Sequence, residues 1–347
     1  MTDNDGSFDE VLARFAATGP EFGGGLSNHG PMAAEALVAL GRGDAVAPWA
    51  EWYARRLLDP PQARNAIAPD DWREALGDIA RAGDWIAFFE RELGRRPWRD
   101  AVETWVARLA PGIMAGATHG ILRTAHAVRS LDRGENPQRL RELAEGLAYW
   151  AARYQSLPTA LAGQRRLGVA AALAEVPLVP AASRRAGLIF DAVKAVDAAG
   201  FSPAIGLVDV DGAAGEFVSG VTRAFVRQYL ANAPTASISF IHTVTAPSAL
   251  RTLAPHLSAE TRRDAMRYAW QACASIYAAY GSEPAPVVHV NDAAVDADDL
   301  VEQAVAARDE HAIKFTEACL KEHRLTGDAA FLAAAQDAVA RLRRTEK

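Results

Sequence analysis

Four histidines, His29, His119, His242 and His311, are the residues of this sequence whose type and spacing best suit chemistry. Each lies near the start or middle of a helix-like stretch, and the residue seven positions on is alanine or histidine. Seven residues make about two helical turns, so each such pair shares one helix face. The pattern predicts four helices that aim imidazoles at one centre. The alternative is four histidines that only satisfy a polar core.

The chemistry that this pattern favours is metal binding. Neutral imidazole is the commonest protein ligand for first-row metals, and helical bundles build such sites from inward side chains on facing helices. No single segment holds a His-Glu-x-x-His, Glu-x-x-His or Cys-x-x-Cys motif, a nucleophile elbow, a Walker loop or a dinucleotide fingerprint. A site is therefore assembled only by folding. The Gly23–Gly25 run could cradle a phosphate, but a flexible turn is the better interpretation.

Lys314 adds a candidate oxygen ligand. It lies one turn beyond His311 and shares its helix face. A lysine buried beside an imidazole loses charge by desolvation, and its neutral amine can react with carbon dioxide to form an anionic carbamate. Such a carboxylated Lys314 would supply the oxygen that four imidazoles lack. The alternative is a lysine whose stem packs on apolar side chains while its charged end reaches water.

Composition excludes several classes of partner. The 347 residues are half apolar, and 37 basic against 43 acidic residues give a net charge of −6 without long blocks of either sign. Nucleic acid is thus not an expected partner. Apolar runs stay short of the ~20 residues of a membrane span, and the N-terminus lacks the basic flank and apolar run of a secretory signal. Cys273 and Cys319 fall in helical stretches as free thiols, so a cytoplasmic protein is expected.

The dominant periodicity is helical and predicts an all-α fold, a single large multi-helix bundle with at most minor short strands. We expect one domain over 1–347, with 1–7 disordered. The strand candidates are 204–208 and 287–290. The expected helices cover 8–17, 29–40, 49–58, 72–89, 101–131 with a break at 111–112, 140–154, 184–199, 222–231, 237–253, 261–280, 296–323 and 328–344.

Four segments in this order resemble the questin oxidase-like family, and they span most of the sequence. They are Asn28–Ala33, His119–Arg129, Phe240–Thr245 and His311–Ala318. The resemblance implies an oxygenase that acts on polycyclic aromatic substrates, including ring opening of Baeyer–Villiger type, with NADPH consumed in some of the reactions. It also implies a non-haem iron held by histidines and a carboxylated lysine. Carried onto this sequence, that ligand set is His29, His119, His242, His311 and Lys314.

Two further residues are candidates for a catalytic role. Arg123, one turn beyond His119, could pair with a phenolate or quinone oxygen of a substrate, and the alternative is a structural ion pair. His126 shares a face with His119 and could either hydrogen-bond a ligand or compete with it. We assign His256, His289 and His323 to structural or solvent-facing positions.

The sequence therefore predicts a metal-dependent oxygenase whose partners are a small aromatic molecule and dioxygen. Two other classes stay open. One is a non-catalytic helical protein that binds a small molecule or acts as a scaffold. The other is a hydrolase that holds zinc with the same histidines.

Overall fold

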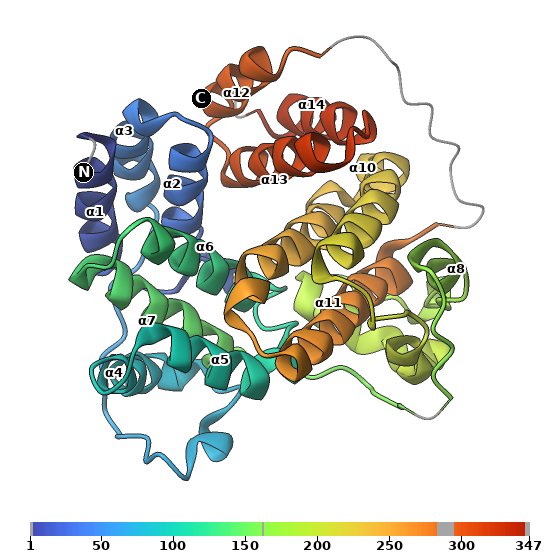
Figure 1. The fold of residues 1–347 in the computed structure, drawn as a ribbon, viewed down its shortest axis with the longest axis horizontal. Coiled ribbons are helices and arrows are strands. Elements are labelled where there is room, and N and C mark those ends of the chain that lie inside the picture. The colour runs from blue at the N-terminus through green and yellow to red at the C-terminus, as the bar shows by residue number, and fades with distance from the viewer. Residues whose placement is uncertain (1–2, 162, 283–294, 344–347) are drawn as a thin grey trace. The chain divides into compact units, whose positions relative to one another are not determined.

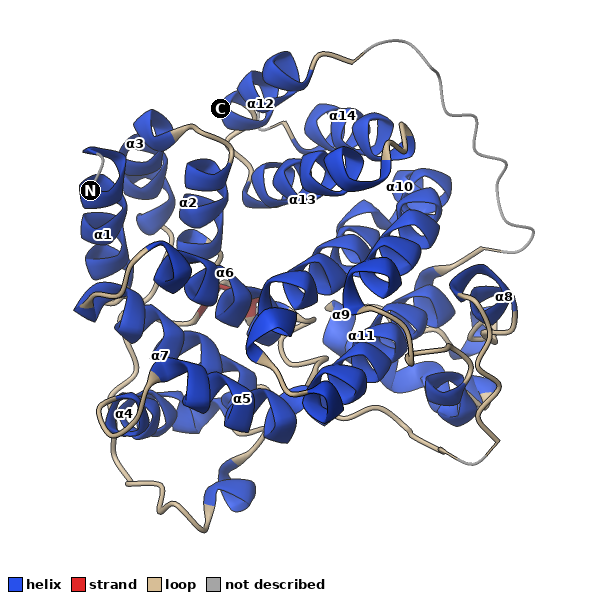
Figure 2. Ribbon diagram, viewed as in Figure 1, coloured by secondary structure: helices blue, strands red, loops and turns tan. Residues whose placement is uncertain are grey.

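The computed structural model describes residues 3–161, 163–282 and 295–343 (Figure 1). These residues form fourteen α-helices, several short 3-10 helices and one two-stranded sheet, so the predicted all-α fold is confirmed (Figure 2). The chain divides into two compact units, 1–155 and 156–347. The single domain over 1–347 stays a prediction, and each unit is described by itself.

The first unit contains seven helices and a small hairpin. The hairpin pairs β1 (Glu21–Phe22) with β2 (Leu26–Ser27) in antiparallel register around the Gly23–Gly25 turn. The three glycines all have positive φ, which the sequence analysis anticipated as a turn but not as a hairpin. The helices are α1 (Asp3–Phe15), α2 (Gly30–Ala39), α3 (Gly43–Ala54), α4 (Ala82–Leu93), α5 (Trp98–Leu109), α6 (His119–Arg133) and α7 (Pro137–Ala152).

Several boundaries in this unit differ from the prediction. Helix α1 starts at Asp3, so residues 3–7, expected to be disordered, are helical. The segment 72–89, predicted as one helix, instead contains two 3-10 helices before α4. The break has a local cause, because Gly77 between them has a φ of 77°. The predicted interruption near Pro111 is confirmed, since a 3-10 helix follows α5 there.

Helices α6 and α7 approach each other closely at two glycines. A Cβ atom at Gly120 would lie 2.7 Å from the Cα atom of Trp150, and one at Gly146 would lie 3.0 Å from the backbone nitrogen of Thr124. The missing side chains therefore let the two backbones touch. This contact fixes the start of α6, where His119 lies.

The second unit is built around two long helical segments, α10 (Ala214–Leu253) and α11 (Ala259–Tyr280). Helix α10 is not straight. Ala236 has non-helical dihedrals of −147° and 36°, and the Arg251 Nη2 donates to Ser219 Oγ at 2.8 Å. In a straight helix these two residues would be about 48 Å apart. The segment therefore turns back on itself after Pro234, in agreement with the two helices predicted there.

The other helices of this unit are α8 (Val169–Ala174), α9 (Ile189–Ala192), α12 (Ala297–Ala306), α13 (Glu310–Thr326) and α14 (Ala330–Leu342). The single helix predicted over 296–323 is wrong, because Arg308 has a φ of 53° and separates α12 from α13. The helix predicted over 184–199 is only α9 and a 3-10 helix, and the strand predicted over 204–208 falls mostly in a 3-10 helix, Ser202–Gly206. The other strand candidate, 287–290, lies outside the described residues.

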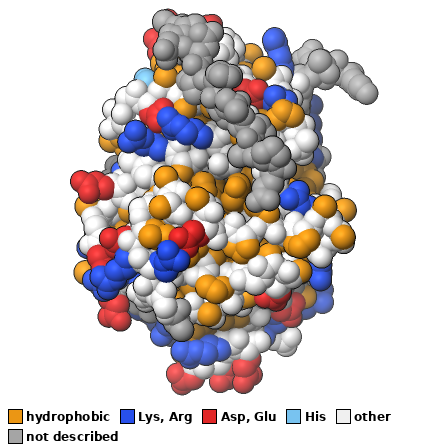
Figure 3. Space-filling view, turned by 90° about the vertical axis from the view of Figure 1, so that its right-hand side faces the viewer, with side chains coloured by type: hydrophobic (Ala, Val, Ile, Leu, Met, Phe, Trp, Pro, Cys, Tyr) orange, Lys and Arg blue, Asp and Glu red, His pale blue; other side chains and the backbone are white. Residues whose placement is uncertain are grey.

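The surface fits the modest net charge. On the face in Figure 3, Lys and Arg side chains lie interspersed with Asp and Glu side chains, without a large area of one sign. Among the described helices, none has the length and apolar composition that crossing a membrane requires.

Candidate metal-binding histidines

In the first unit, His29 and His119 lie beside each other. Their ring centroids are 4.3 Å apart, and both side chains are at least nine-tenths buried. His29 directly precedes α2, and its backbone N–H donates to the Tyr53 hydroxyl at 2.9 Å. The Asn28 side chain accepts from the first N–H of α2 at 2.9 Å, but the N-cap residue of this helix is His29 and not Asn28 as predicted. Two histidines 90 residues apart in sequence are thus brought together within one unit.

The backbone before His119 is conformationally unusual. Gly116, Ala117 and Thr118 have consecutive positive φ values of 52°, 58° and 69°. Left-handed conformations cost free energy for residues with a side chain and cluster at functional sites. A Cβ atom on Gly116 would lie 2.5 Å from the Tyr149 hydroxyl, so glycine is required there for space as well.

This turn also fixes the tautomer of His119. The Gly116 carbonyl oxygen lies 2.5 Å from His119 Nδ1. A carbonyl only accepts, so Nδ1 carries a proton, and in the neutral imidazole Nε2 then holds the lone pair. Metal-bound histidines are oriented in this way by backbone carbonyls. The chemical state of His119 therefore suits a metal ligand.

In the second unit, His242 and His311 form another pair, with ring centroids 6.0 Å apart. His242 is buried in the second half of α10, and His311 lies in the first turn of α13. Asp309 caps that helix, because its Oδ1 accepts from the backbone N–H groups of His311 and Ala312 at 2.8 and 3.2 Å. Asp309, Glu310 and His311 each offer a donor atom, and these atoms lie within 4.8 Å of one another.

Lys314 is buried on the same helix, with 3% of its surface exposed. Burial lowers the pKa of Lys314 to about 8, although Glu310 and Asp309 act in the opposite direction. The alternative in which the charged end of Lys314 reaches water requires an exposed ammonium group, so this degree of burial disfavours it. About a tenth of the amine is therefore neutral at pH 7, and carbamate formation requires this neutral form.

Arg123 is engaged by two buried carboxylates of α7. Its Nε and Nη2 donate to Glu142 at 2.6 and 2.7 Å, and Nη2 also donates to Glu145 at 2.6 Å. Although burial disfavours its charge, the two acids raise the pKa of Arg123 above its ordinary value. Burial raises the pKa of Glu142 to about 7, and Arg123 opposes that shift. These are the contacts of the ion-pair alternative for Arg123.

His126 takes part in a second charged cluster. Its Nδ1 lies 2.7 Å from Glu35 Oε2, and Arg129 and Arg133 donate to the same carboxylate. Burial acts to raise the pKa of Glu35, but Arg129 and His126 outweigh it and hold that pKa well below its usual range. Because Glu35 lies on α2 and the cations lie on α6, the cluster joins the helices adjacent to His29 and His119.

Comparison with known families identifies the chain. The model of the family described as Questin oxidase-like matches residues 27–202. The chain belongs to the Questin oxidase-like family. Membership in this family implies an oxidoreductase. It suggests an oxidase or oxygenase that acts on aromatic substrates. A search of curated proteins found no match.

The family match covers one of the two histidine pairs. His29 and His119, together with Glu35 and the α6 cluster, fall inside the matched residues. The segments around His242 and His311 lie beyond them, so their assignment depends on the motifs noted above. His323, at the end of α13, is bonded by Nδ1 to the Asp328 carbonyl at 3.1 Å and has a structural role. His289 lies outside the described residues.

Sequence reasoning missed the carboxylates that lie beside the candidate site residues. Glu35, Glu142, Glu145, Asp309 and Glu310 all contribute to the clusters described above. Asp309 and Glu310 directly precede His311 and were detectable, because an acidic residue before a helix is a typical N-cap. Glu35 and the α7 pair gave no local signal, since their partners are 91, 19 and 22 residues away.

Proposed function

We propose that this protein is a metal-dependent oxygenase that acts on an aromatic or quinone-like small molecule, with a Baeyer–Villiger-type or carbon–carbon bond-cleaving reaction. The observation that carries the proposal is the buried His29–His119 pair, which lies within the residues that match the family. The metal proposed is non-haem iron, and its proposed ligands are His29, His119, His242, His311 and a carboxylated Lys314.

The donor chemistry of these residues fits iron. Imidazole nitrogen and carboxylate-like oxygen suit Fe(II), whereas thiolates, which favour zinc and iron–sulfur clusters, do not contribute. His119 supports the proposal through its orientation, since Nδ1 bonds the Gly116 carbonyl, as backbone carbonyls orient metal-bound histidines, and Nε2 would be the coordinating nitrogen. Iron bound there would supply the electron transfer to dioxygen that an oxygenase requires.

Lys314 would contribute the oxygen ligand. Its neutral amine would attack carbon dioxide, forming a carbon–nitrogen bond and releasing one proton, to give a carbamate anion. The burial of Lys314 favours the neutral amine that this step needs. NADPH, consumed in some reactions of the family, is the proposed reductant where one is required.

The proposal is tested by metal analysis of the full chain, purified without oxygen and supplied with Fe(II). We expect about one iron per chain, and loss of that iron in His29→Ala, His119→Ala, His242→Ala and His311→Ala. His323→Ala is the matched control, because its imidazole bonds a backbone carbonyl at a helix end. Consumption of dioxygen with a panel of phenols and quinones, with and without NADPH, provides the second measurement.

Three results would overturn the proposal. Zinc at full occupancy without oxygen consumption on any quinone or phenol would favour a hydrolase. A metal-free protein whose stability is unchanged by chelators would favour a binding or scaffold protein. Iron content that is unaffected by all four histidine substitutions would place the metal elsewhere.

A separate pair of variants tests the carbamate. Lys314→Ala should lower the iron content, and added bicarbonate should not restore it. Lys314→Glu supplies a carboxylate directly and should recover part of that iron without bicarbonate. Equal iron content in the wild type and Lys314→Ala would exclude Lys314 as a ligand while leaving the histidines in place.

A further inference from the structure

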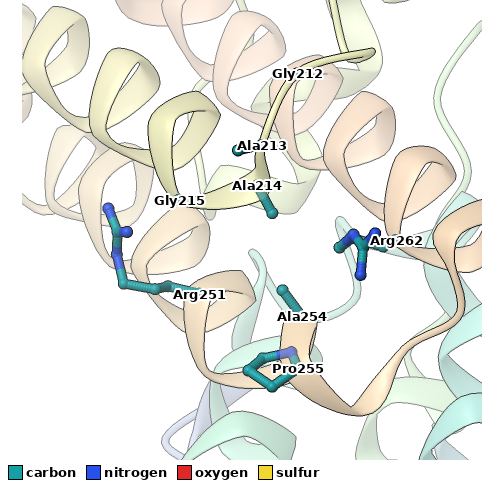
Figure 4. A pocket seen from close by; sticks show the side chains of 8 residues that line it. All are labelled: Gly212, Ala213, Ala214, Gly215, Arg251, Ala254, Pro255 and Arg262. Carbon is teal, nitrogen blue, oxygen red and sulfur yellow. The ribbon is translucent and has the colours of Figure 1, made fainter.

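The second unit contains an open pocket of about 420 Å³, and neither His242 nor His311 is among its lining residues (Figure 4). It is lined by Gly212–Gly215, where α10 begins, by Arg251 and Ala254, where α10 ends, and by Pro255 and Arg262. Small-molecule sites have volumes of roughly 300–1,000 Å³, so this pocket has room for a small organic ligand.

The charge of the lining selects an anion. Arg251 and Arg262 are the only charged residues among the eight that line the pocket, and the others are glycine, alanine and proline. The nearby carboxylates are already engaged, since Glu322 accepts from Arg251 and Asp211 pairs with Arg166 and Arg263. Glu322 thus balances the charge of Arg251, and Arg262 is the cation of the lining that has no ion-pair partner among the described residues.

The guanidinium of Arg251 is held by other residues through only two of its three nitrogens, Nε and Nη2. Its Nε donates to Glu322 at 3.0 Å, and its Nη2 donates to Glu322 and Ser219. Within the part of the chain that the structure describes, Nη1 makes no hydrogen bond. A Cβ atom on Gly215 would lie 3.3 Å from this Nη1, so the available donors lie at the pocket wall formed by Gly215. Glu322 holds the guanidinium in place without using all of its donors.

Arg262 lies across from Arg251 in Figure 4. Its guanidinium makes one hydrogen bond to a described residue, a long one of 3.4 Å from Nη1 to the Leu257 carbonyl, and it forms no ion pair with any of those residues. The wall between the two arginines adds backbone donors. The N–H groups of Ala214, Gly215 and Glu216 find no acceptor among the described residues, and the N-cap residue Ala213 has no side chain that could accept.

We infer that this pocket binds a phosphate monoester, with its phosphate group between Arg251 and Arg262 and its organic part against Ala254 and Pro255. A phosphate group has several oxygens that accept from guanidinium and backbone N–H donors together, whereas a carboxylate offers only two. The pocket is much larger than a phosphate ion alone, and its remaining wall is apolar, which favours a ligand with a carbon skeleton. This site is independent of the histidines.

The experiment is calorimetric titration of the full chain with glycerol 3-phosphate, inorganic phosphate and glycerol at fixed ionic strength. We expect the monoester to bind, inorganic phosphate to bind more weakly, and glycerol not to bind. Arg262→Gln should weaken binding of the monoester about tenfold or more, because a charge-assisted hydrogen bond is lost. Arg263→Gln is the matched control, because the neighbouring Arg263 pairs with Asp211 and does not line the pocket.

A second variant distinguishes loss of binding from loss of folding. Ala213→Asp places a carboxylate at the N-cap of α10, where aspartate is favoured, so the variant should fold at least as stably as the wild type. The same carboxylate would occupy the anion position and abolish binding. Binding of the monoester that survives Ala213→Asp or Arg262→Gln, or that Arg263→Gln weakens equally, would overturn the inference. Equal affinity for inorganic phosphate would overturn the part that assigns an organic ligand.

Discussion

Replacing Arg123 with methionine should strongly destabilise the first unit. The side chains of Arg123, Glu142 and Glu145 are 2%, 6% and 5% exposed, so the substitution leaves two buried carboxylates without their shared cation. Removing one partner of a buried ion pair costs about 3–5 kcal/mol. For a unit of the size of 1–155, 1 kcal/mol changes the melting temperature by about 2–4 °C, so a decrease of roughly 6–20 °C is expected for the transition of this unit.

Replacing Glu142 with glutamine should have a much smaller effect. Arg123 keeps its bond of 2.6 Å to Glu145, so the pair remains neutral as a whole. Burial raises the pKa of Glu142 to about 7, and about half of this side chain is therefore already uncharged at neutral pH. A neutral side chain of the same shape should cost about 1 kcal/mol or less. The two variants of one cluster thus differ by a predicted 2 kcal/mol or more.

Urea unfolding of the full chain at pH 7, followed by circular dichroism, measures both free energies of unfolding. Arg99→Met is the surface control, because its pair with Asp132 at 3.3 Å is exposed and should contribute well under about 1 kcal/mol. Equal costs for Arg123→Met and Glu142→Gln would refute the reasoning. An Arg123→Lys protein that unfolds like the wild type but has lost turnover would instead favour the role of Arg123 as a substrate partner.

Three further predictions concern the first unit. The folded-state pKa of Glu142 is raised from 4.5 to about 7, so the folded state binds a proton that the unfolded state releases between these pH values. The free energy of unfolding should therefore fall as pH rises from about 4.5 to 7. Urea midpoints measured across this range should show that fall in the wild type and lose the part due to Glu142 in Glu142→Gln. Gly120→Ala should cost about 1–3 kcal/mol, because its Cβ would meet the Trp150 backbone at 2.7 Å, whereas Gly134→Ala, with 3.5 Å to its nearest neighbour, should unfold like the wild type. Glu35→Gln should weaken iron binding without removing a proposed ligand, and iron titration of this variant beside Glu51→Gln, an exposed glutamate, measures the effect.

The helices were predictable where capping and stop signals agree with periodicity. The segment 29–40 corresponds to α2, with Pro31 in the first turn, and 261–280 corresponds to α11, capped by Ser258. The division between α12 and α13 has a sequence signal on one side only, the N-cap Asp309 of α13. It depends on Arg308 in a left-handed conformation, and neither glycine nor proline marks that position in the sequence.

In the candidate site, too, features set by neighbouring residues could be predicted from the sequence, and contacts between distant helices could not. Helical spacing identified the faces that carry His29, His119, His242 and His311, because that information lies within about two turns. It could not identify which acid meets which cation. Glu35 is 91 residues from His126, and no spacing rule connects residues on different helices. The roles of His126 and Arg123 were therefore left open by the sequence, and their contacts with buried carboxylates are visible only in the folded chain.

These carboxylate clusters explain how the first unit can hold two imidazoles at a fixed separation. His29 directly precedes α2 and His119 begins α6, so the distance between their rings depends on how those helices pack. Glu35 on α2 binds three side chains of α6 at once, and it is 1% exposed. A shift of either helix would leave a buried carboxylate without cations, which is far more costly than moving two neutral rings. The ring separation of 4.3 Å is therefore set by charged residues that need not touch a metal.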